Sequence, residues 1–357
     1  MERSEPERPN RRAALGFGAA VALTAALPAR KAFAAPGTDA PGTHGGHSGA
    51  LGFSGKEVLG VTGPGRALLS NRRLYHSTVM QSFGFDERRG HLYALQVMQG
   101  GVRLRGEPRA YSHSEREDRG DLCLNRLDMK GRRLGHMFLK GVGHGGALGI
   151  EPLKDRTVLW TEWDAAPRSG YGRGVCRFSF ANGKVLTSQS LRDSSYRPKP
   201  GSTNNYVTLD VAHGRVLLHY RRDDEPWFAV YALDRFLARD FRPLIEFQRP
   251  ATDLRLPFQG MTLYDSSAYQ MLGSAYGPKN PRSSGGNTRL FRIDVRSGVT
   301  LENTLDRTAP GLNPREPEGL AVLNTKKGPQ LCMGFAHGKA RARRFSVFMK
   351  DIGWSAL

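Results

Sequence analysis

The 357-residue chain has few cysteines and lacks the common signatures of catalysis. Its three cysteines, Cys123, Cys176 and Cys332, form no C-x-x-C pair, so neither a disulfide framework nor a cysteine-ligated metal is indicated. G-x-S-x-G, Walker A, H-E-x-x-H and EF-hand patterns are also absent, which removes the usual serine-hydrolase, nucleotide, zinc-protease and calcium signals. We expect the three cysteines to be buried free thiols.

Acidic residues are also scarce. Lys and Arg number 53 against 33 Asp and Glu, a formal net charge of +20. Residues 1–34 hold six of the basic and three of the acidic residues, which leaves 47 − 30 = +17. A chain this basic concentrates near polyanions, such as teichoic acids, anionic glycans, lipid headgroups or extracellular DNA. Scattered pairs such as Arg72-Arg73 are also what a general arginine bias produces, and no specific nucleic-acid site is indicated.

The N-terminus resembles an export signal. Arg11-Arg12 precede an apolar run over residues 13–27, which ends near Ala32-Phe33-Ala34. This order predicts a twin-arginine signal peptide over residues 1–34, cleaved after Ala34. The alternative is an uncleaved membrane anchor, although the run is short and alanine-rich for a span. No other segment is apolar enough to cross a membrane.

Residues 35–54 are rich in Gly, Pro, Ser and Thr and predict a flexible leader. His44 and His47 lie in this leader, but no carboxylate or cysteine accompanies them, so a metal site there is not indicated. We expect residues 55–357 to form one domain.

The clearest positive feature is an internal repeat of about sixty residues. Five apolar strands recur around Gly84, Gly149, Thr208, Thr262 and Ala321, at steps of 65, 59, 54 and 59 residues. A second apolar strand follows each of them; these strands lie at residues 92–96, 158–162, 216–220, 270–274 and 331–335. Short strands repeated at such a period are typical of a β-propeller.

Further strands complete each repeat. A third strand and a tight turn are clearest at Lys130-Gly131, Asn182-Gly183 and Ser297-Gly298, and a fourth strand follows, as at residues 133–138. Sustained helical periodicity is absent, except for a short turn expected over residues 233–239. We therefore predict an all-β fold, a five-bladed β-propeller of four-stranded antiparallel blades. The last repeat lacks an outer strand, so closure needs a strand from residues 59–69 or 351–357.

Polar residues recur where the inner strands begin, which is where a propeller presents its channel mouth. The leading residues of the five inner strands are Gln81, His144, Asn205, Gln259 and Glu318. Glycine follows three of them, which lets the backbone crowd toward the axis. The ends of the second strands approach the same mouth and supply Gln96, Glu162, His219, Arg221, Tyr276 and His337. Such a ring could bind a sugar or phosphodiester, or could tie the blades together around trapped water.

Acid–base chemistry is an alternative use of this mouth. Glu162 and Glu318 are the candidate carboxylates, with His144 as a third catalytic candidate. A metal held by His144, His219 and Glu318 is a weaker possibility, because histidines from separate blades form no spacing motif.

Two stretches resemble a known family. Phe83-Gly-Phe-Asp86 with residues 92–96 resembles the first blade of teichoic acid biosynthesis protein C propellers, and residues 120–137 with Gly143-His144-Gly145 and Ile150-Glu151-Pro152 resemble the second. The propeller of some staphylococcal phage receptor-binding proteins is similar, and the likeness covers residues 65–345. It implies a five-bladed propeller and, in the phage case, recognition of wall teichoic acid.

Three functions remain open. The leading hypothesis is a secreted, cell-wall-associated monomer that binds an anionic glycan such as wall teichoic acid at one channel mouth. The alternatives are a hydrolase or lyase acting on a polysaccharide or teichoic-acid-like polymer, and a scaffold for protein partners. No cofactor can be assigned from the sequence.

Overall fold

A computed structural model describes residues 53, 58–250 and 255–350. The chain divides into two units, residues 1–53 and 54–357, and every helix and strand given below lies in the second. The signal expected over residues 1–34 and the leader over 35–54, apart from Phe53, lie outside the described residues and stay predictions. The two α-helices of the described ranges have seven and five residues, so neither could cross a bilayer.

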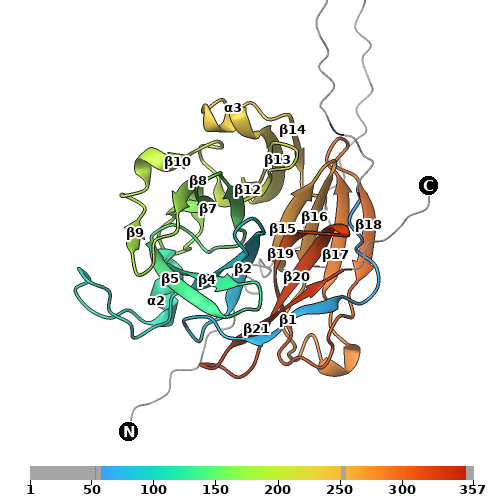
Figure 1. Ribbon diagram of the computed structural model, residues 1–357, viewed down its shortest axis with the longest axis horizontal. Coiled ribbons are helices and arrows are strands. Elements are labelled where there is room, and N and C mark those ends of the chain that lie inside the picture. Colours follow the sequence, from blue (N-terminus) through green and yellow to red (C-terminus); the bar gives the residue numbers. More distant parts are fainter. Residues whose placement is uncertain (1–52, 54–57, 251–254, 351–357) are drawn as a thin grey trace, which may run out of the picture. The chain divides into compact units, whose positions relative to one another are not determined.

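The all-β prediction is confirmed, because five antiparallel sheets follow one another around a central axis (Figure 1). We number these sheets as blades 1 to 5 in the order of their inner strands. The inner strands are β2 (Met80–Asp86), β6 (Gly149–Pro152), β11 (Thr203–Asp210), β15 (Phe258–Tyr264) and β19 (Glu316–Thr325). The second strands are β3 (His91–Val97), β7 (Thr157–Ala165), β12 (Arg215–Arg222), β16 (Ser267–Leu272) and β20 (Gly328–His337).

The third and outer strands complete the blades. The third strands are β4 (Leu122–Asp128), β8 (Gly172–Ser179), β13 (Glu225–Ala232), β17 (Arg289–Asp294) and β21 (Arg344–Met349). The outer strands are β5 (Arg133–Lys140), β10 (Ser195–Tyr196), β14 (Ile245–Gln248), β18 (Thr300–Leu305) and β1 (Arg66–Arg72). Blade 1 also carries a fifth strand, β9 (Val185–Thr187), which runs parallel to β5. The resemblance matched residues 120–137 to a second blade, but the strands in this stretch, β4 and β5, belong to blade 1.

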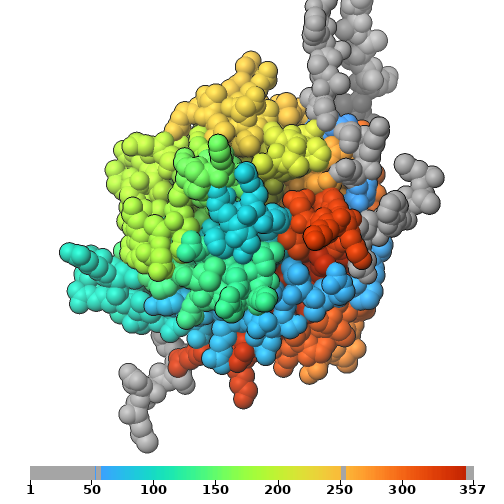
Figure 2. Space-filling view, viewed as in Figure 1, coloured from blue at the N-terminus to red at the C-terminus, as the bar shows by residue number. Residues whose placement is uncertain are grey.

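Blade 5 is closed by the N-terminal part of the unit. Strand β1 pairs antiparallel with β21, with Arg66 opposite Met349 and Arg72 opposite Phe345. Figure 2 shows the blue N-terminal segment lying against the orange and red C-terminal blade. Of the two closing segments expected from the sequence, the described structure therefore uses the earlier one, shifted to residues 66–72. Closure supplies β21 with a partner and leaves that strand no open edge.

Blades are held together by apolar side chains packed between neighbouring sheets. Between blades 1 and 2, Leu95 and Leu124 pack in one cluster with Leu159, Cys176 and Phe178. Each fully buried side chain of this size stabilises the fold by roughly 1.5–3 kcal/mol. All three cysteines are buried and unbridged, as expected, and burial raises their pKa values.

The described chain has two short α-helices, and only one was anticipated. Helix α3 (Leu233–Leu237) confirms the turn expected over residues 233–239. Helix α2 (His113–Arg119) was missed, although Ser112 and Glu115 form a capping box at its start. Two single turns of 3₁₀ helix, η1 (Arg192–Ser194) and η2 (Arg282–Ser284), complete the elements.

The two ends of the propeller differ in their connections. We call the end where the inner strands begin the upper face, and the opposite end the lower face. Long loops at residues 98–121 and 273–288 lie on the upper face, because they join a second strand to a third strand. The lower face carries mostly tight turns, apart from the segment that contains α3 and the segment over residues 180–194, which contains β9 and η1. Loops on a rigid scaffold commonly carry binding function, which directs attention to the upper face.

Candidate functional site

The first residues of the inner strands touch one another around the upper end of the axis. Ser82 Oγ donates to the Gly145 carbonyl at 2.7 Å, which joins blade 1 to the segment that enters blade 2. A Cβ added at Gly146 would lie 2.5 Å from the Tyr206 ring, so only glycine fits there. The rings of Tyr206 and Phe258 stack with centroids 5.6 Å apart, which joins blade 3 to blade 4.

Two glycines complete this ring of contacts. A Cβ at Gly260 in blade 4 would lie 2.8 Å from Gly319 Cα in blade 5. A Cβ at Gly319, whose φ is +82°, would lie 3.0 Å from Ser82 Cα in blade 1. The crowding expected from glycine after a polar residue is therefore present, and it brings the five inner strands into contact at their upper ends.

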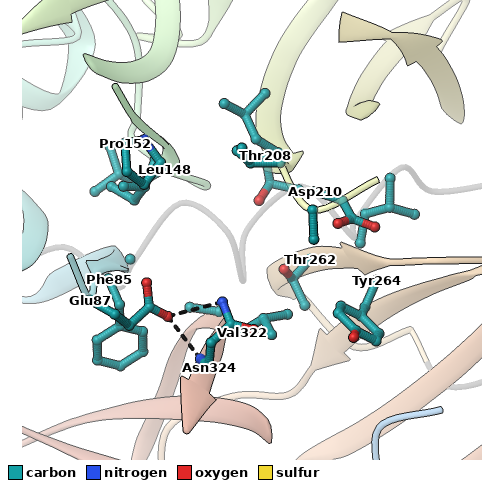
Figure 3. Close-up of a pocket in the computed structure, with 17 residues that line it drawn as sticks. Phe85, Glu87, Leu148, Pro152, Thr208, Asp210, Thr262, Tyr264, Val322 and Asn324 are labelled. Carbon is teal, nitrogen blue, oxygen red and sulfur yellow. Dashed lines mark hydrogen bonds between the residues drawn. The ribbon is translucent and has the colours of Figure 1, made fainter. Parts of the chain in front are cut away.

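Below these contacts, a cavity of about 100 Å³ occupies the lower part of the axis. The later halves of all five inner strands line it, as Figure 3 shows. The Glu87 carboxylate accepts hydrogen bonds from the Asn324 backbone at 2.8 Å and side chain at 3.3 Å. Asp210 accepts the Asp265 amide at 2.7 Å, and burial raises the pKa of its carboxyl. A cavity of this size has room for only a few waters.

Most of the residues proposed from the sequence are buried. Nine of the eleven are at most 7% exposed: Gln81, Gln96, His144, Glu162, Asn205, His219, Gln259, Glu318 and His337. The other two, Arg221 and Tyr276, are half-buried. Of the eleven proposed residues, Arg221 and Tyr276 therefore have the most surface available for direct contact with a large ligand at the upper face.

Several buried members of the set bond to backbone. Gln96 Nε2 donates to the His76 carbonyl at 3.1 Å, Gln259 Nε2 donates to the Gly273 carbonyl at 2.9 Å, and Asn205 Nδ2 donates to the Gly172 carbonyl at 3.2 Å. His337 Nε2 lies 3.0 Å from Ser346 Oγ. These bonds hold strand ends and connecting segments in place at the upper face.

Glu162 bridges two backbone segments. One carboxylate oxygen accepts the Gly145 amide at 2.6 Å and the other accepts the Gly172 amide at 2.8 Å. These bonds tie the entry to β6 to the start of β8. A carboxylate that is fully buried and accepts two amides is well suited to hold loops in place.

Glu318, the second candidate carboxylate, is also fully buried. His144, the third catalytic candidate, packs with its ring centre 5.3 Å from that of Tyr171. The described residues contain no group of three or more His, Cys, Asp or Glu side chains arranged to hold a metal ion. His144, His219 and Glu318 are therefore not assembled into a metal site within this part of the chain.

Two arginines and three rings gather between blades 3 and 4, and we call Tyr206, His219, Arg221, Arg249 and Phe258 the Arg249 cluster. The Arg249 guanidinium lies 5.4 Å from the centre of the Phe258 ring. Among the described residues, nothing accepts a hydrogen bond from that guanidinium. Burial, followed by the nearby charge of Arg221, lowers the pKa of Arg249 to about 10. Arg249 is therefore a half-buried cation whose charge the described protein does not compensate.

The His219 ring stacks on the other two rings of the Arg249 cluster. It lies 5.3 Å from the Tyr206 ring and 4.8 Å from the Phe258 ring. Burial lowers the pKa of His219 well below its ordinary value, and the charge of Arg249 adds to the effect. The ring is therefore neutral at pH 7, with Nδ1–H donating to the Asn204 carbonyl at 3.2 Å. Nε2 is buried with no hydrogen-bond partner in the described residues.

The sequence pointed to part of this cluster and missed the rest. His219 and Arg221 were proposed from their place at the end of a second strand. Arg249, Tyr206 and Phe258 were not proposed, because Arg249 lies just after an outer strand and its neighbours come from other strands. The available signal was the place of Arg249 directly after β14, where the connection to blade 4 begins.

The fold is a five-bladed propeller, and two arginines, Arg221 and Arg249, lie near each other at its upper face. The chain belongs to the family described as phage 5-bladed β-propeller receptor binding platform domain, whose model matches residues 79–349. The resemblance drawn from the sequence is thereby confirmed.

One curated relative and one solved structure show the same likeness. The chain is 26% identical over 302 residues to the protein named teichoic acid biosynthesis protein C in Bacillus subtilis (strain 168), which covers 82% of this chain and 64% of that protein. The tail fiber of Staphylococcus aureus phage P68 is similar in fold, with a TM-score of 0.61 and 15% identity over 85% of this chain and 55% of that one. The chain thus spans less than two thirds of either protein.

Proposed function

We propose that this protein is a cell-surface recognition propeller that binds an anionic glycan, such as wall teichoic acid, on its upper face. The observation that carries the proposal is the uncompensated charge of Arg249 beside Arg221. A phosphate or carboxylate placed between the two guanidinium groups would relieve their mutual repulsion and accept charge-assisted hydrogen bonds.

The surroundings of the two arginines suit a sugar polymer with anionic groups. Phe258 and Tyr206 offer apolar ring surface next to the cations, as sites for sugars often do. Membership of a receptor-binding propeller family supports recognition at a cell surface, and the name of the Bacillus subtilis relative supports a teichoic acid as the ligand. Binding requires the chain to be exported, as the sequence of residues 1–34 predicts.

Binding is favoured over bond cleavage by the state of the proposed carboxylates. Glu162 and Glu318 are both fully buried, and Glu162 accepts two backbone amides. General acid–base catalysis needs a carboxyl group within hydrogen-bond reach of the substrate.

The proposal is tested by co-sedimentation with purified Gram-positive cell walls that carry teichoic acid or have been stripped of it. We expect the wild-type protein to pellet with intact walls and not with stripped walls, and to release no soluble fragments. The Arg249→Met variant should bind about ten- to a hundred-fold more weakly, the range for loss of a charge-assisted hydrogen bond. Equal pelleting with both wall preparations would overturn the proposal, and released fragments would support the hydrolase or lyase instead.

A further inference from the structure

A second basic feature lies on the upper face of blade 4. A groove of about 560 Å³ is bounded by loop 273–288, residues 255–256 and the end of β18. Its lining includes four basic residues, Arg255, Lys279, Arg289 and Arg307, and we therefore call it the basic groove. This volume falls in the range of sites that hold a small molecule or one unit of a polymer.

The basic groove has charge of one sign. Four of its lining residues are cationic and none of the lining residues is a carboxylate. Arg255 is exposed, and no described residue pairs with its guanidinium. Cations gathered along a concave wall raise the local concentration of anions.

The walls of the basic groove are held by hydrogen bonds. Arg307 Nη1 donates to the Gly286 carbonyl at 2.8 Å, which fixes loop 273–288 to the end of blade 4. Asn280 Nδ2 donates to Asn287 Oδ1 at 3.2 Å, and Arg289 Nη1 donates to Asn303 Oδ1 at 3.0 Å. These bonds hold the walls of the groove and two of its cations in place, so the shape of the groove needs little rearrangement when an anion enters.

The basic groove and the Arg249 cluster share one connection. Arg249 lies at its start, just after β14, and Arg255 lies near its end, just before β15. Both features open on the upper face, because β14 ends there and β15 begins there. A flexible polymer held at one of them can therefore reach the other without leaving that face.

We propose that the basic groove is a second subsite that takes another phosphodiester group of the polymer bound at the Arg249 cluster. The inference rests on the proposed function and extends it, because it makes the ligand a repeating polyanion that is held at two points. Two linked contacts give an apparent affinity above that of either contact alone, through the effective concentration of the second group.

The test compares oligo(glycerol phosphate) probes of two and eight repeats in titrations at several salt concentrations. The Arg255→Gln/Arg289→Gln double variant removes two groove cations. Its control, Lys326→Gln/Lys327→Gln, removes two exposed cations from the turn between β19 and β20 on the lower face. For the eight-repeat probe we expect the groove variant to bind about tenfold more weakly, as loss of bidentate phosphate contacts implies, and the control to change less than about twofold.

The outcomes separate this inference from the proposed function. If the wild-type protein binds the eight-repeat probe and the groove variant binds it as the control does, the groove subsite is overturned and the function stands. If the wild-type protein binds neither probe, the proposed function is overturned and the subsite falls with it. The single Lys279→Gln variant repeats the comparison should the double variant unfold, with a smaller loss expected for the same reason.

Discussion

Replacing Arg249 by methionine should make the free protein more stable while it weakens binding. The pKa of Arg249 is about 10, against an ordinary value of 12.5. A difference of about 2.5 pKa units, at about 1.36 kcal/mol each, means that the folded state holds this charge at a cost of about 3 kcal/mol. The cation–π contact with Phe258 offsets roughly 0.5–1 kcal/mol of this cost. The net gain expected for Arg249→Met is therefore about 2 kcal/mol.

The gain has a defined pH dependence. The folded pKa of Arg249 is lowered, so between about pH 10 and 12.5 the unfolded chain binds more protons than the folded chain. The cost of the charge is therefore complete below about pH 10 and shrinks as the pH rises above that value. At pH 7 the Arg249→Met variant should therefore show its full gain in folding stability over the wild type.

The assay is differential scanning calorimetry at pH 7, with co-sedimentation on teichoic-acid-containing walls in parallel. We expect Arg249→Met to raise Tm by a few degrees, the size that about 2 kcal/mol produces in a domain of this scale. Arg222→Met is the matched control, because Arg222 is exposed on the same blade and lies over the Trp227 ring at 5.7 Å. A variant at position 249 that lowers Tm and leaves binding unchanged would refute the reasoning.

Four further predictions concern three buried carboxylates and the N-terminal signal. Glu162→Gln should lower the free energy of unfolding by about 1–3 kcal/mol, because one of its two backbone amides loses a carboxylate acceptor. Asp306→Asn should cost about 3–5 kcal/mol, because two fully buried cations lose their common carboxylate. Burial alone would raise the pKa of Glu107, but hydrogen bonds from cationic neighbours outweigh it and hold the pKa at about 2. Its stabilisation should therefore be complete above about pH 4.5 and be lost as the pH falls through 2, which urea unfolding of the wild type and Glu107→Gln between pH 2 and 7 will show. N-terminal sequencing of the exported protein should find a new terminus directly after Ala34.

Each of these has a contradicting result. A Glu162→Gln protein that keeps its Tm and loses cleavage of a wall polymer would point to catalysis. An unchanged urea midpoint in Asp306→Asn would mean that the buried cations find other acceptors. A wild-type advantage over Glu107→Gln that disappears near pH 4 would contradict the low pKa, and an intact N-terminus on exported protein would contradict the cleaved signal.

Much of the fold was readable because a propeller repeats its pattern. Apolar strands such as β12 and β20 stand out, since both of their faces pack against neighbouring blades. Helix α2 was missed because it carries no apolar stripe, and its one buried side chain is the charged Arg116. Arg116 is held by Glu107 and Asp121, an arrangement that depends on residues brought together by the loop.

The site was less predictable than the fold. Gln81, Asn205, Gln259 and Glu318 lie within the first three residues of their inner strands, whereas His144 lies five residues before β6 begins at Gly149. The burial of these side chains follows from how closely the strand ends approach, as at Gly260 and Gly319. Arg249 was missed for a related reason. The charge of Arg249 is uncompensated because Arg221 lies nearby and no described residue accepts a hydrogen bond from its guanidinium. Both conditions depend on the fold and cannot be inferred from the residues next to Arg249 in the sequence.

The contacts that join the inner strands at their upper ends close the axis to a polymer that approaches from the upper face. A chain that cannot thread along the axis must lie across the outside of the ring, with both of its ends free. Such a surface recognises interior repeats as readily as terminal ones. The number of protein molecules bound to each polymer molecule should then grow with polymer length, which a reader of chain ends would not show.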